Sequence, residues 1–340
     1  MCLVAFALDQ SSRFPFVVAA NRDEFFDRPA ARLGWWEPSP GDLPILGGRD
    51  LHAGGTWLGL TAQGRLGLVT NVRNPAATDP KAPSRGEIVS RWLKGDLPMY
   101  RLWPQLALNG YNGFNLLALD FSQGECHWVN NSQSMPVRLE KGIFGISNAE
   151  LDTPWPKLEQ LKAELKVALN ASADAEQLAM SLFESLSDTT VYPDESLPHT
   201  GVPMEWERLL SSAFIKSPDG AYGTRCATVI ITERVNKRLV THVLERTFSA
   251  QSSMALLRRV TLKNWPPRHT ADVMELAKLN ATLPPASLQP AWHVTGSDDP
   301  FESSDVSEHD NHALPDGAVG RRSRARNLIK LGGARPSKAA

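Results

Sequence analysis

Short apolar runs, rich in β-branched and aromatic residues, alternate with polar segments through most of the chain. Residues 3–8 and 16–20 are two such runs, and the polar stretch between them predicts that they pair as strands. Residues 57–61 and 66–71 flank a short segment that contains Gly64, which is typical of a hairpin. The same pattern predicts further strands at 114–119, 126–129, 143–147, 227–232 and 240–248.

Helical patterns interrupt the strands in two blocks. Residues 84–87 have the spacing of a capping box before an apolar face, so a helix is predicted from there to Gly95. Thr153-Pro154 predicts the start of a second helix, and a third is expected at about 174–186. The second helix carries leucines at period 3.6: Leu158, Leu161, Leu165 and Leu169. This order of elements predicts an α+β fold in which antiparallel sheets are covered by helices.

The composition fits a folded protein without a strong overall charge. Apolar residues make up 42% of the 340 residues, and 36 Lys and Arg oppose 37 Asp and Glu. The net charge of -1 argues against nucleic acid or an anionic membrane as a general partner. The three cysteines are too scattered for a disulfide framework or a zinc knuckle, which indicates a reducing compartment. With no basic leader and no apolar run near the ~18 residues of a membrane span, a cytoplasmic protein is expected.

The composition changes after about residue 250. A Pro-rich stretch is followed by an acidic run from 298 to 316 with seven carboxylates. The chain then ends in a basic cluster: Arg321, Arg322, Arg324, Arg326, Lys330, Arg335 and Lys338. Without apolar periodicity, residues 250–340 are predicted to be a mostly disordered tail beside a folded domain at 1–249. A basic run can bind RNA or anionic lipid, but a solubilising tail that neutralises its own charge is the simpler interpretation.

Cys2 is the first candidate for chemistry. A small residue after Met1 is the usual context for removal of the initiator methionine, which would give Cys2 a free α-amine. That amine has an ordinary pKa of about 7.7–8.0 and the thiol one of about 8.5, so one residue would hold both a nucleophile and a base. The alternative is that Cys2 is a small apolar residue at the start of a buried strand.

A polar cluster, Asn21-Arg22-Asp23-Glu24, follows the second predicted strand. If the first two strands pair, the cluster lies near Cys2, where a carboxylate could hold the amine and a guanidinium could favour the thiolate. Asn71 and Asn148 also follow predicted strands, and an Asn side chain can donate to a tetrahedral oxyanion, although a turn or cap is its more usual role. The histidines share no metal-ligand spacing, so no metal site is predicted.

Several motifs together resemble the NRDE family, whose members are also called Transport and Golgi organization 2 proteins. The motifs occur in order over about residues 1–249: Met1-Cys2, Ala19 to Phe25, Gly54 to Gly59, Tyr111 to Leu116, Gly145 to Asn148 with Pro154-Trp155, and Tyr222 to Arg225. They resemble more distantly the N-terminal-cysteine hydrolases, such as penicillin V acylases and conjugated bile acid hydrolases. That resemblance implies a four-layer αββα sandwich of N-terminal nucleophile hydrolase type, and cleavage of a linear carbon–nitrogen amide bond through an acyl-enzyme on cysteine.

The resemblance to these hydrolases implies a set of catalytic residues: Cys2, Arg22, Asp23, Asn71, Asn148 and Arg225. Asn21, Glu24 and Thr224 are expected to assist in binding. One departure is that the hydrolases separate their Arg and Asp by two residues, whereas Arg22 and Asp23 are adjacent. Either the strand end is rearranged or Glu24 takes the place of the carboxylate.

The NRDE resemblance also implies a second function. Family members are associated with intracellular haem trafficking and with acyl-CoA or lipid handling, neither of which requires a covalent intermediate. The cleft of the fold would then carry haem or an acyl-CoA as cargo, whereas hydrolysis of a small acyl amide would need no cofactor. Tryptophans could line such a pocket, although core packing is their more common role: Trp35, Trp36, Trp57 and Trp155. A third interpretation, a scaffold that acts through its tail, leaves the polar cluster without a role.

Overall fold

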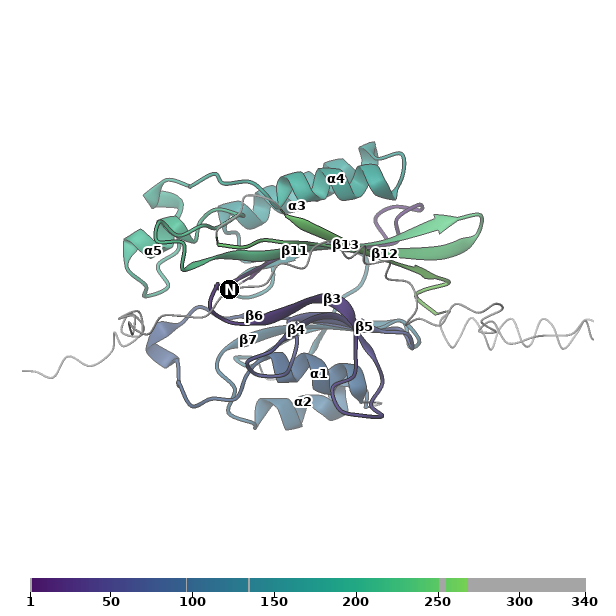
Figure 1. Cartoon of the computed structure of the whole chain (residues 1–340), viewed down its shortest axis with the longest axis horizontal. Helices are drawn as coiled ribbons and strands as arrows, with labels where there is room; N and C mark the ends of the chain where they lie inside the picture. The colour runs from purple at the N-terminus through teal and green to yellow at the C-terminus, as the bar shows by residue number, and fades with distance from the viewer. Residues whose placement is uncertain (1, 96, 134, 251–254, 268–340) are drawn as a thin grey trace, which may run out of the picture. The chain divides into compact units, whose positions relative to one another are not determined.

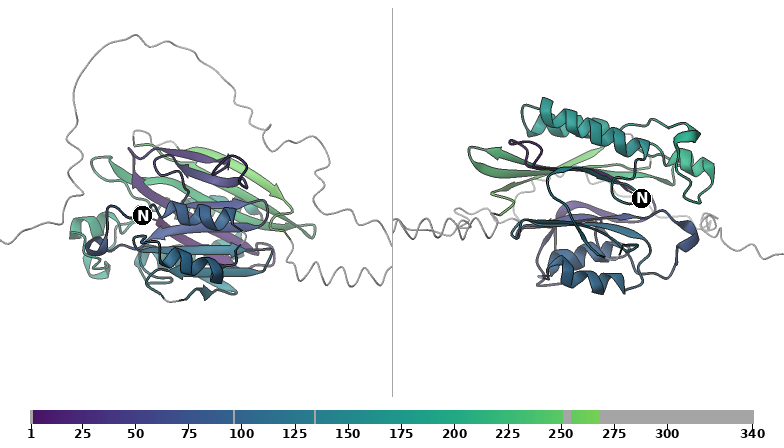
Figure 2. Two further views of the ribbon diagram at one scale, coloured as in Figure 1. Left: turned by 90° about the horizontal axis from the view of Figure 1, so that it is seen from below. Right: turned by 180° about the vertical axis from the view of Figure 1, so that it is seen from behind.

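Two antiparallel sheets face each other in the computed structural model, which describes residues 2–95, 97–133, 135–250 and 255–267. Helices α3 (Pro156–Ala171) and α4 (Ala175–Ser185) cover the outer side of one sheet, and α1 (Gly86–Lys94) and α2 (Met99–Ala107) cover the other (Figure 1). The view from behind shows the same four layers (Figure 2). The α+β class and the αββα sandwich predicted from the sequence are therefore confirmed.

In the part of the chain that the structure describes, the first sheet has six strands in the order β10-β1-β2-β11-β12-β13. Their bounds are Gly142–Ile146, Cys2–Leu8, Phe16–Phe25, Tyr222–Val235, Arg238–Thr247 and Leu256–Lys263. The second sheet runs from β3 to β9 in both sequence and space. Its strands are Ala30–Trp36, Ile45–Asp50, Leu58–Thr61, Arg65–Asn71, Phe114–Asp120, Glu125–Asn130 and Val137–Arg138. A short helix, α5 (Met204–Leu209), and two 3-10 turns, η1 (Pro75–Ala77) and η2 (Asp194–Ser196), lie in the connections.

Successive residues of β1 point to opposite faces of the first sheet. Leu3 and Ala5 pack in the core beneath α3 and α4, whereas Val4 and Phe6 pack between the two sheets. Because both faces of the strand are buried, it reads as a continuous apolar run in the sequence instead of a strict alternation. A third apolar cluster joins the second sheet to α1 and α2.

Helix α1 approaches the second sheet closely because β6 carries glycine where the helix crosses it. A Cβ atom on Gly67 would lie 3.0 Å from Trp92 and 3.1 Å from Val89, both on α1. A larger residue at this position would push α1 outward and loosen the outer core layer. The helix predicted in this segment is confirmed, and it ends as expected at Gly95.

Several elements differ from the sequence prediction. The apolar pattern misses β3, β4 and α2, and glycine at Gly34, Gly47 and Gly48 weakens the strand signal of β3 and β4. Helix α3 begins at Pro156 instead of Thr153-Pro154. A residue that precedes proline is disfavoured in the helical region, so Trp155 stays extended and serves as the N-cap.

Strand β2 extends further than predicted and includes the polar cluster at 21–24. It continues to Phe25 because β11 goes on pairing with it, as far as Tyr222 opposite Phe25. Alternation along a strand sends Arg22 and Glu24 to one face of the sheet and residues 21 and 23 to the other. The cluster is therefore divided between two environments, whereas a turn would have exposed all of it.

Ordered structure continues beyond residue 249, after which the sequence prediction places the tail. Strand β13 pairs with β12 along its whole length. Trp265 is buried between the sheets, where its Nε1 donates a hydrogen bond to the carbonyl oxygen of Thr61 at 2.9 Å. The rest of the predicted tail, with its acidic run and basic cluster, lies outside the described residues. None of the helices that the structure describes is long and apolar enough to cross a membrane.

Candidate active site

The described residues form a cleft of about 400 Å³ where β1 begins and β2 ends. The first sheet contributes Cys2 and residues 22–24 to its walls, and the second sheet contributes Val69 and Asn71. Residues from the 78–86 segment also line the cleft. A cleft of this volume accommodates a small organic ligand.

Cys2 is the first residue of β1 and borders this cleft. Its neighbour across the sheet is Arg22, and its Sγ lies 4.0 Å from the carbonyl oxygen of Val69 on the opposite sheet. The carbonyl oxygen of Cys2 accepts a hydrogen bond from Ser147 Oγ at 3.3 Å, which fixes the start of the strand. Burial raises the pKa of the Cys2 thiol, and the charge of Asp23 raises it further. The thiol is therefore protonated near neutral pH, and a nucleophilic attack from it needs a base.

Arg22 and Glu24 lie on the cleft face of β2. Arg22 is 7% exposed, and its guanidinium stacks on the Trp57 ring at 4.2 Å. Its Nη2 lies 3.9 Å from Oε2 of Glu24, and its buried Nη1 has no hydrogen-bond partner among the described residues. A guanidinium beside a thiol favours the thiolate, so Arg22 opposes the effect of burial on the pKa of Cys2.

The side chains of Asn21 and Asp23 turn to the opposite face of β2, under the helix layer, although Asp23 also borders the cleft at the end of the strand. The Nδ2 of Asn21 donates to the carbonyl oxygens of Leu186 at 2.7 Å and Ala213 at 2.9 Å. Asp23 is 1% exposed, and its Oδ1 accepts a hydrogen bond from the Thr224 hydroxyl of β11 at 2.7 Å. Neither Asn21 nor Thr224 lines the cleft. Both of these residues, predicted to assist in binding, instead hold the buried side of the strand.

Lys157 completes the buried side, and the sequence prediction does not include it. It is 4% exposed in the first turn of α3, and its Nζ donates to the carbonyl oxygens of Leu210 at 2.7 Å and Ser212 at 3.4 Å. Burial lowers the pKa of Lys157 to about 8, against the opposing effect of Asp23. Burial also raises the pKa of Asp23, and Lys157 opposes that shift. The sequence signal that could have revealed Lys157 is its position four residues before Leu161, because this spacing puts a charged residue on the apolar face of the helix.

The two predicted oxyanion donors take different positions, because Asn71 lines the cleft and Asn148 does not. Asn148 is 1% exposed, and its Nδ2 donates to the carbonyl oxygen of Asn71 at 2.9 Å. The carbonyl oxygen of Asn148 accepts from the backbone N–H of Arg73 at 2.7 Å. Asn148 therefore holds the end of β6 in place, and Asn71 is the residue that a ligand in the cleft would meet.

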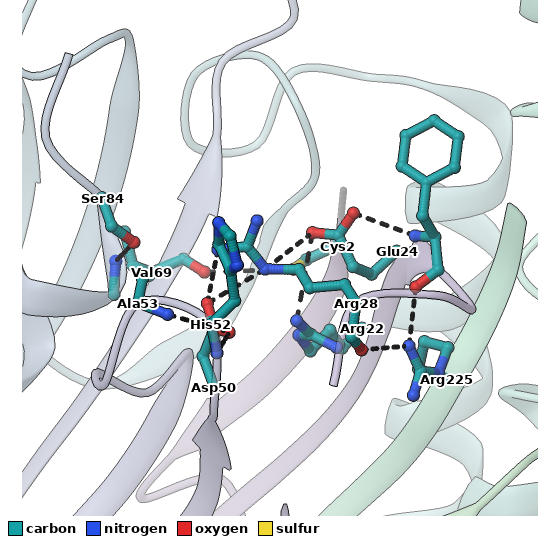
Figure 3. Close-up of polar contacts among 12 residues, drawn as sticks. Cys2, Arg22, Glu24, Arg28, Asp50, His52, Ala53, Val69, Ser84 and Arg225 are labelled. Carbon is teal, nitrogen blue, oxygen red and sulfur yellow. Dashed lines mark hydrogen bonds and ion pairs between the residues drawn. The ribbon is translucent and has the colours of Figure 1, made fainter. Parts of the chain in front are cut away.

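Arg225 lies at a β-bulge in β11, and its hydrogen bonds go to the turn that follows β2. Its Nη1 donates to the carbonyl oxygens of Phe25 at 2.6 Å and Arg28 at 2.9 Å (Figure 3). The same turn presents the Arg28 side chain, whose Nη2 lies 2.6 Å from Oδ2 of Asp50 (Figure 3). Arg225 therefore shapes the rim of the cleft.

The cleft carries charges of both signs. Arg22, Arg28 and Arg85 border it together with the carboxylates of Glu24 and Asp50. Burial lowers the pKa of Arg85, which precedes α1, and the neighbouring charge of Glu24 opposes this. Arginines in such a cleft suit a carboxylate or phosphate group of a ligand. In the described ranges, no group of three or more His, Cys, Asp or Glu is arranged to hold a metal ion.

The structure thus gathers five of the predicted residues on the cleft: Cys2, Arg22, Asp23, Glu24 and Asn71. The other four support it from outside: Asn148 behind β6, Asn21 and Thr224 on the buried face, and Arg225 at the rim. The predicted removal of Met1 concerns a residue outside those described.

Comparisons with known proteins bear on the family. A family model described as Transport and Golgi organisation 2 matches residues 1–250. The Transport and Golgi organization 2 homolog of Mus musculus is 33% identical over 250 residues, which covers 68% of this chain and 89% of that protein. The Homo sapiens homolog is 32% identical over 250 residues with the same two coverages. The Transport and Golgi organization protein 2 of Drosophila melanogaster is 26% identical over 272 residues, covering 73% of this chain and 93% of that protein.

A solved structure is also similar to this chain. It is the C2A mutant of the conjugated bile acid hydrolase from Clostridium perfringens, with a TM-score of 0.40 and 8% sequence identity. The match covers 77% of this chain and 96% of that chain.

Proposed function

The chain belongs to the Transport and Golgi organisation 2 family, and we propose that it hydrolyses a linear amide with Cys2 as the nucleophile. The observation that carries this proposal is the position of Cys2, which is the first residue of β1 and borders the cleft. Removal of Met1 would leave a thiol and an α-amine on this one residue. Asp23 supports the proposal, because it is the next residue of β2 after the partner of Cys2 and so lies beside the amino end of β1.

In the proposed reaction, Sγ of Cys2 attacks the amide carbonyl carbon while the α-amine accepts the thiol proton. The side chain of Asn71 donates to the tetrahedral oxyanion. The carbon–nitrogen bond then breaks, and the protonated α-amine returns its proton to the leaving nitrogen. Water attacks the resulting thioester with the α-amine as base, the carbon–sulfur bond breaks, and the carboxylic acid leaves as the thiol re-forms.

The electrostatics of the site support a base-assisted mechanism. Because burial raises the pKa of the Cys2 thiol, little thiolate is present before the substrate binds. A base on the same residue removes the proton during attack, and a positioned base contributes about 10²–10⁴-fold to a rate. Arg22 stacks on Trp57 and stabilises the thiolate as it forms.

The test compares the full-length protein with two variants on a panel of N-acyl amides, after mass analysis of the amino terminus. Cys2→Ser weakens the nucleophile. Insertion of one glycine before Cys2 keeps the thiol and moves the α-amine by one residue, so it is the matched control for the base. We expect Met1 to be absent, and each variant to lose about 10²-fold or more in kcat/KM. Retained Met1, or full activity in the glycine-extended variant, would contradict the proposal.

A carrier of an anionic ligand is the second candidate, and the arginines of the cleft favour it. The propionates of haem or the phosphates of an acyl-CoA would pair with Arg22 and Arg85. Absorbance titration with haem and calorimetry with an acyl-CoA test this function. A carrier shows saturable binding near one equivalent that Arg85→Gln weakens and Cys2→Ala retains. No binding of either ligand at micromolar concentration would exclude it.

Both candidates are proposed to act in the cytoplasm. The cysteines of the described residues are free thiols, and thiols persist in a reducing compartment. Fractionation of cells that express the full-length chain with a carboxyl-terminal tag tests this location, because such a tag leaves the processing of Met1 undisturbed. Recovery of the chain in a secretory compartment would contradict it.

A further inference from the structure

We propose that Lys157 is a positioning residue, which keeps the α-amine of Cys2 neutral near physiological pH by competing with it for the carboxylate of Asp23. This inference rests on the proposed function, since it requires a free α-amine on Cys2. This role follows from the positions of three groups around the amino end of β1. The thiol of Cys2 lies on the cleft face, the carboxylate of Asp23 lies at the end of β2, and the ammonium group of Lys157 lies on the helix side of the sheet.

The first step is the position of the carboxylate. Cys2 pairs with Arg22, so β1 begins there and Asp23 is the next residue of β2. Asp23 is 1% exposed, and its charge acts on the Cys2 thiol. A buried carboxylate that faced the α-ammonium group alone would stabilise the charged form and raise the pKa of the amine. The amine would then be protonated at neutral pH and would not serve as a base.

The second step is that Lys157 brings another cation to the same carboxylate. Its Nζ is held against the carbonyl oxygens of Leu210 and Ser212. The same segment reaches Asp23 through Thr224, whose hydroxyl accepts from the backbone N–H of Ile215 at 2.9 Å and donates to Asp23 at 2.7 Å. The charge of Asp23 acts on Lys157 across this short distance. One carboxylate cannot neutralise two ammonium groups, so a charge on Lys157 lowers the pKa of the α-amine.

The other charges around Lys157 change this balance little. Arg73, which follows β6, and Glu207 of α5 both act on Lys157, but they form an ion pair with each other at 2.6 Å, so their effects largely cancel. Arg22 and Glu24 lie on the cleft side of β2, where their charged groups are 3.9 Å apart. Tyr222 of β11 also faces Asp23, but burial and the charge of that carboxylate raise its pKa, so its phenol is uncharged near neutral pH. We therefore expect the protonation of the amine to follow the charges of Asp23 and Lys157.

The test is an NMR titration of the full-length protein without substrate. Cysteine labelled with ¹³C gives signals from three residues, and Cys2→Ser identifies those of Cys2. The pH dependence of the Cα and Cβ shifts then reports the pKa of the amine and of the thiol. Lys157→Gln keeps a donor for the carbonyl oxygen of Leu210 and removes the charge, whereas Lys157→Arg keeps both.

We expect the pKa of the α-amine to rise by about one unit or more in Lys157→Gln, and not to rise in Lys157→Arg. The acid limb of kcat/KM should shift with it, which gives about a tenfold loss near pH 6 for one unit. An unchanged pKa in Lys157→Gln, or a raised one in Lys157→Arg, overturns the proposal. A lysine with a purely structural role would change Tm in Lys157→Gln and leave the pKa of the amine unchanged.

The titration also separates this inference from the proposed function. An unchanged pKa of the amine together with Cys2-dependent turnover overturns the inference alone. A shifted pKa without hydrolysis of any amide overturns the proposed function and supports the coupling between Lys157 and the amine. Retained Met1 overturns both.

Discussion

The two faces of β2 hold their polar residues in different environments. On the cleft face, Arg22 and Glu24 border a ligand-sized space together with Cys2. On the helix face, Asn21 is enclosed by hydrogen bonds to backbone carbonyl groups, and Asp23 lies near the buried Lys157. A single strand therefore holds polar side chains in two environments, and Asp23, at its end, borders both of them.

A nucleophile and the groups that set its protonation state therefore need not share a surface. Solvent and salt screen charges on the open face, whereas charges behind the strand act through a medium of low dielectric constant. Substitutions on the cleft face should therefore affect chemistry, and substitutions on the helix face should affect pKa values and stability.

The largest effect is expected for substitution of Cys2, and Cys226 provides the matched control. Cys2 and Cys226 pair with Arg22 from the strands on either side, but Cys226 is buried and does not line the cleft. Cys2→Ala should lower kcat for amide hydrolysis by about 10³-fold or more, because the nucleophile is lost. Cys226→Ala should leave kcat nearly unchanged in the same initial-rate assay. Equal losses in the two variants would show that the face as a whole, and not the thiol of Cys2, supports activity.

The two asparagines should also separate chemistry from support. Asn71→Ala should lower kcat by about 10²–10³-fold, which is typical of removing one oxyanion donor. Asn148→Ala should instead lower the free energy of unfolding by about 1–3 kcal/mol, because a buried carbonyl oxygen loses its donor. Steady-state kinetics and urea denaturation of both variants check this. A larger loss of kcat in Asn148→Ala would reverse the assignment.

Asn21 tests the helix face directly. Asn21→Ala should lower the free energy of unfolding by about 2–4 kcal/mol, since the carbonyl oxygens of Leu186 and Ala213 lose their donors and a small cavity opens. Urea denaturation measures this loss. A variant that stays stable but no longer binds substrate would instead support the binding role predicted from the sequence.

Lys157 should make stability depend on pH. Burial lowers its pKa in the folded protein to about 8 from an ordinary value of 10.5, so its contribution to stability is present above pH 10.5 and is lost as the pH falls through 8. Relative to Lys157→Gln, the unfolding free energy of the natural protein should fall by about 1–3 kcal/mol over that window. Urea denaturation of both proteins between pH 7 and 10.5 measures the difference. A difference that does not vary with pH would contradict the burial argument.

The smallest effect is expected at Thr224. Thr224→Val removes a hydroxyl that donates to Asp23 and accepts from the backbone N–H of Ile215, with little change in shape, so the free energy of unfolding should fall by about 1–2 kcal/mol. The pKa of Asp23 should rise further, because a hydrogen bond to its charged form is lost. Thr224→Ser keeps the hydroxyl and is the control. Thermal unfolding compares the three proteins, and identical Tm values would show that these hydrogen bonds contribute nothing.

Local patterns were sufficient for much of the fold. The pairing of β1 with β2, the β5–β6 hairpin and helix α4 follow from apolar runs, turn residues and caps that act over a few positions. Strands β3 and β4 were missed because Gly34, Gly47 and Gly48 give them little β-propensity. Glycine is needed in β4 because β5 passes very close to it: a Cβ atom on Gly47 would lie 2.5 Å from the carbonyl oxygen of Leu58.

For the site, local patterns alone indicated that Cys2 opens the first strand and that a polar cluster closes the second. The folded chain was needed to show which face each residue of that cluster takes, that Asn148 supports Asn71 from behind, and that Lys157 lies near Asp23. These relations join distant parts of the chain, as the hydrogen bond between Asp23 and Thr224 does across 201 positions. They depend on the packing of α3 and β11 against β1 and β2, and that packing is stabilised by apolar burial summed over many side chains, which no local pattern records.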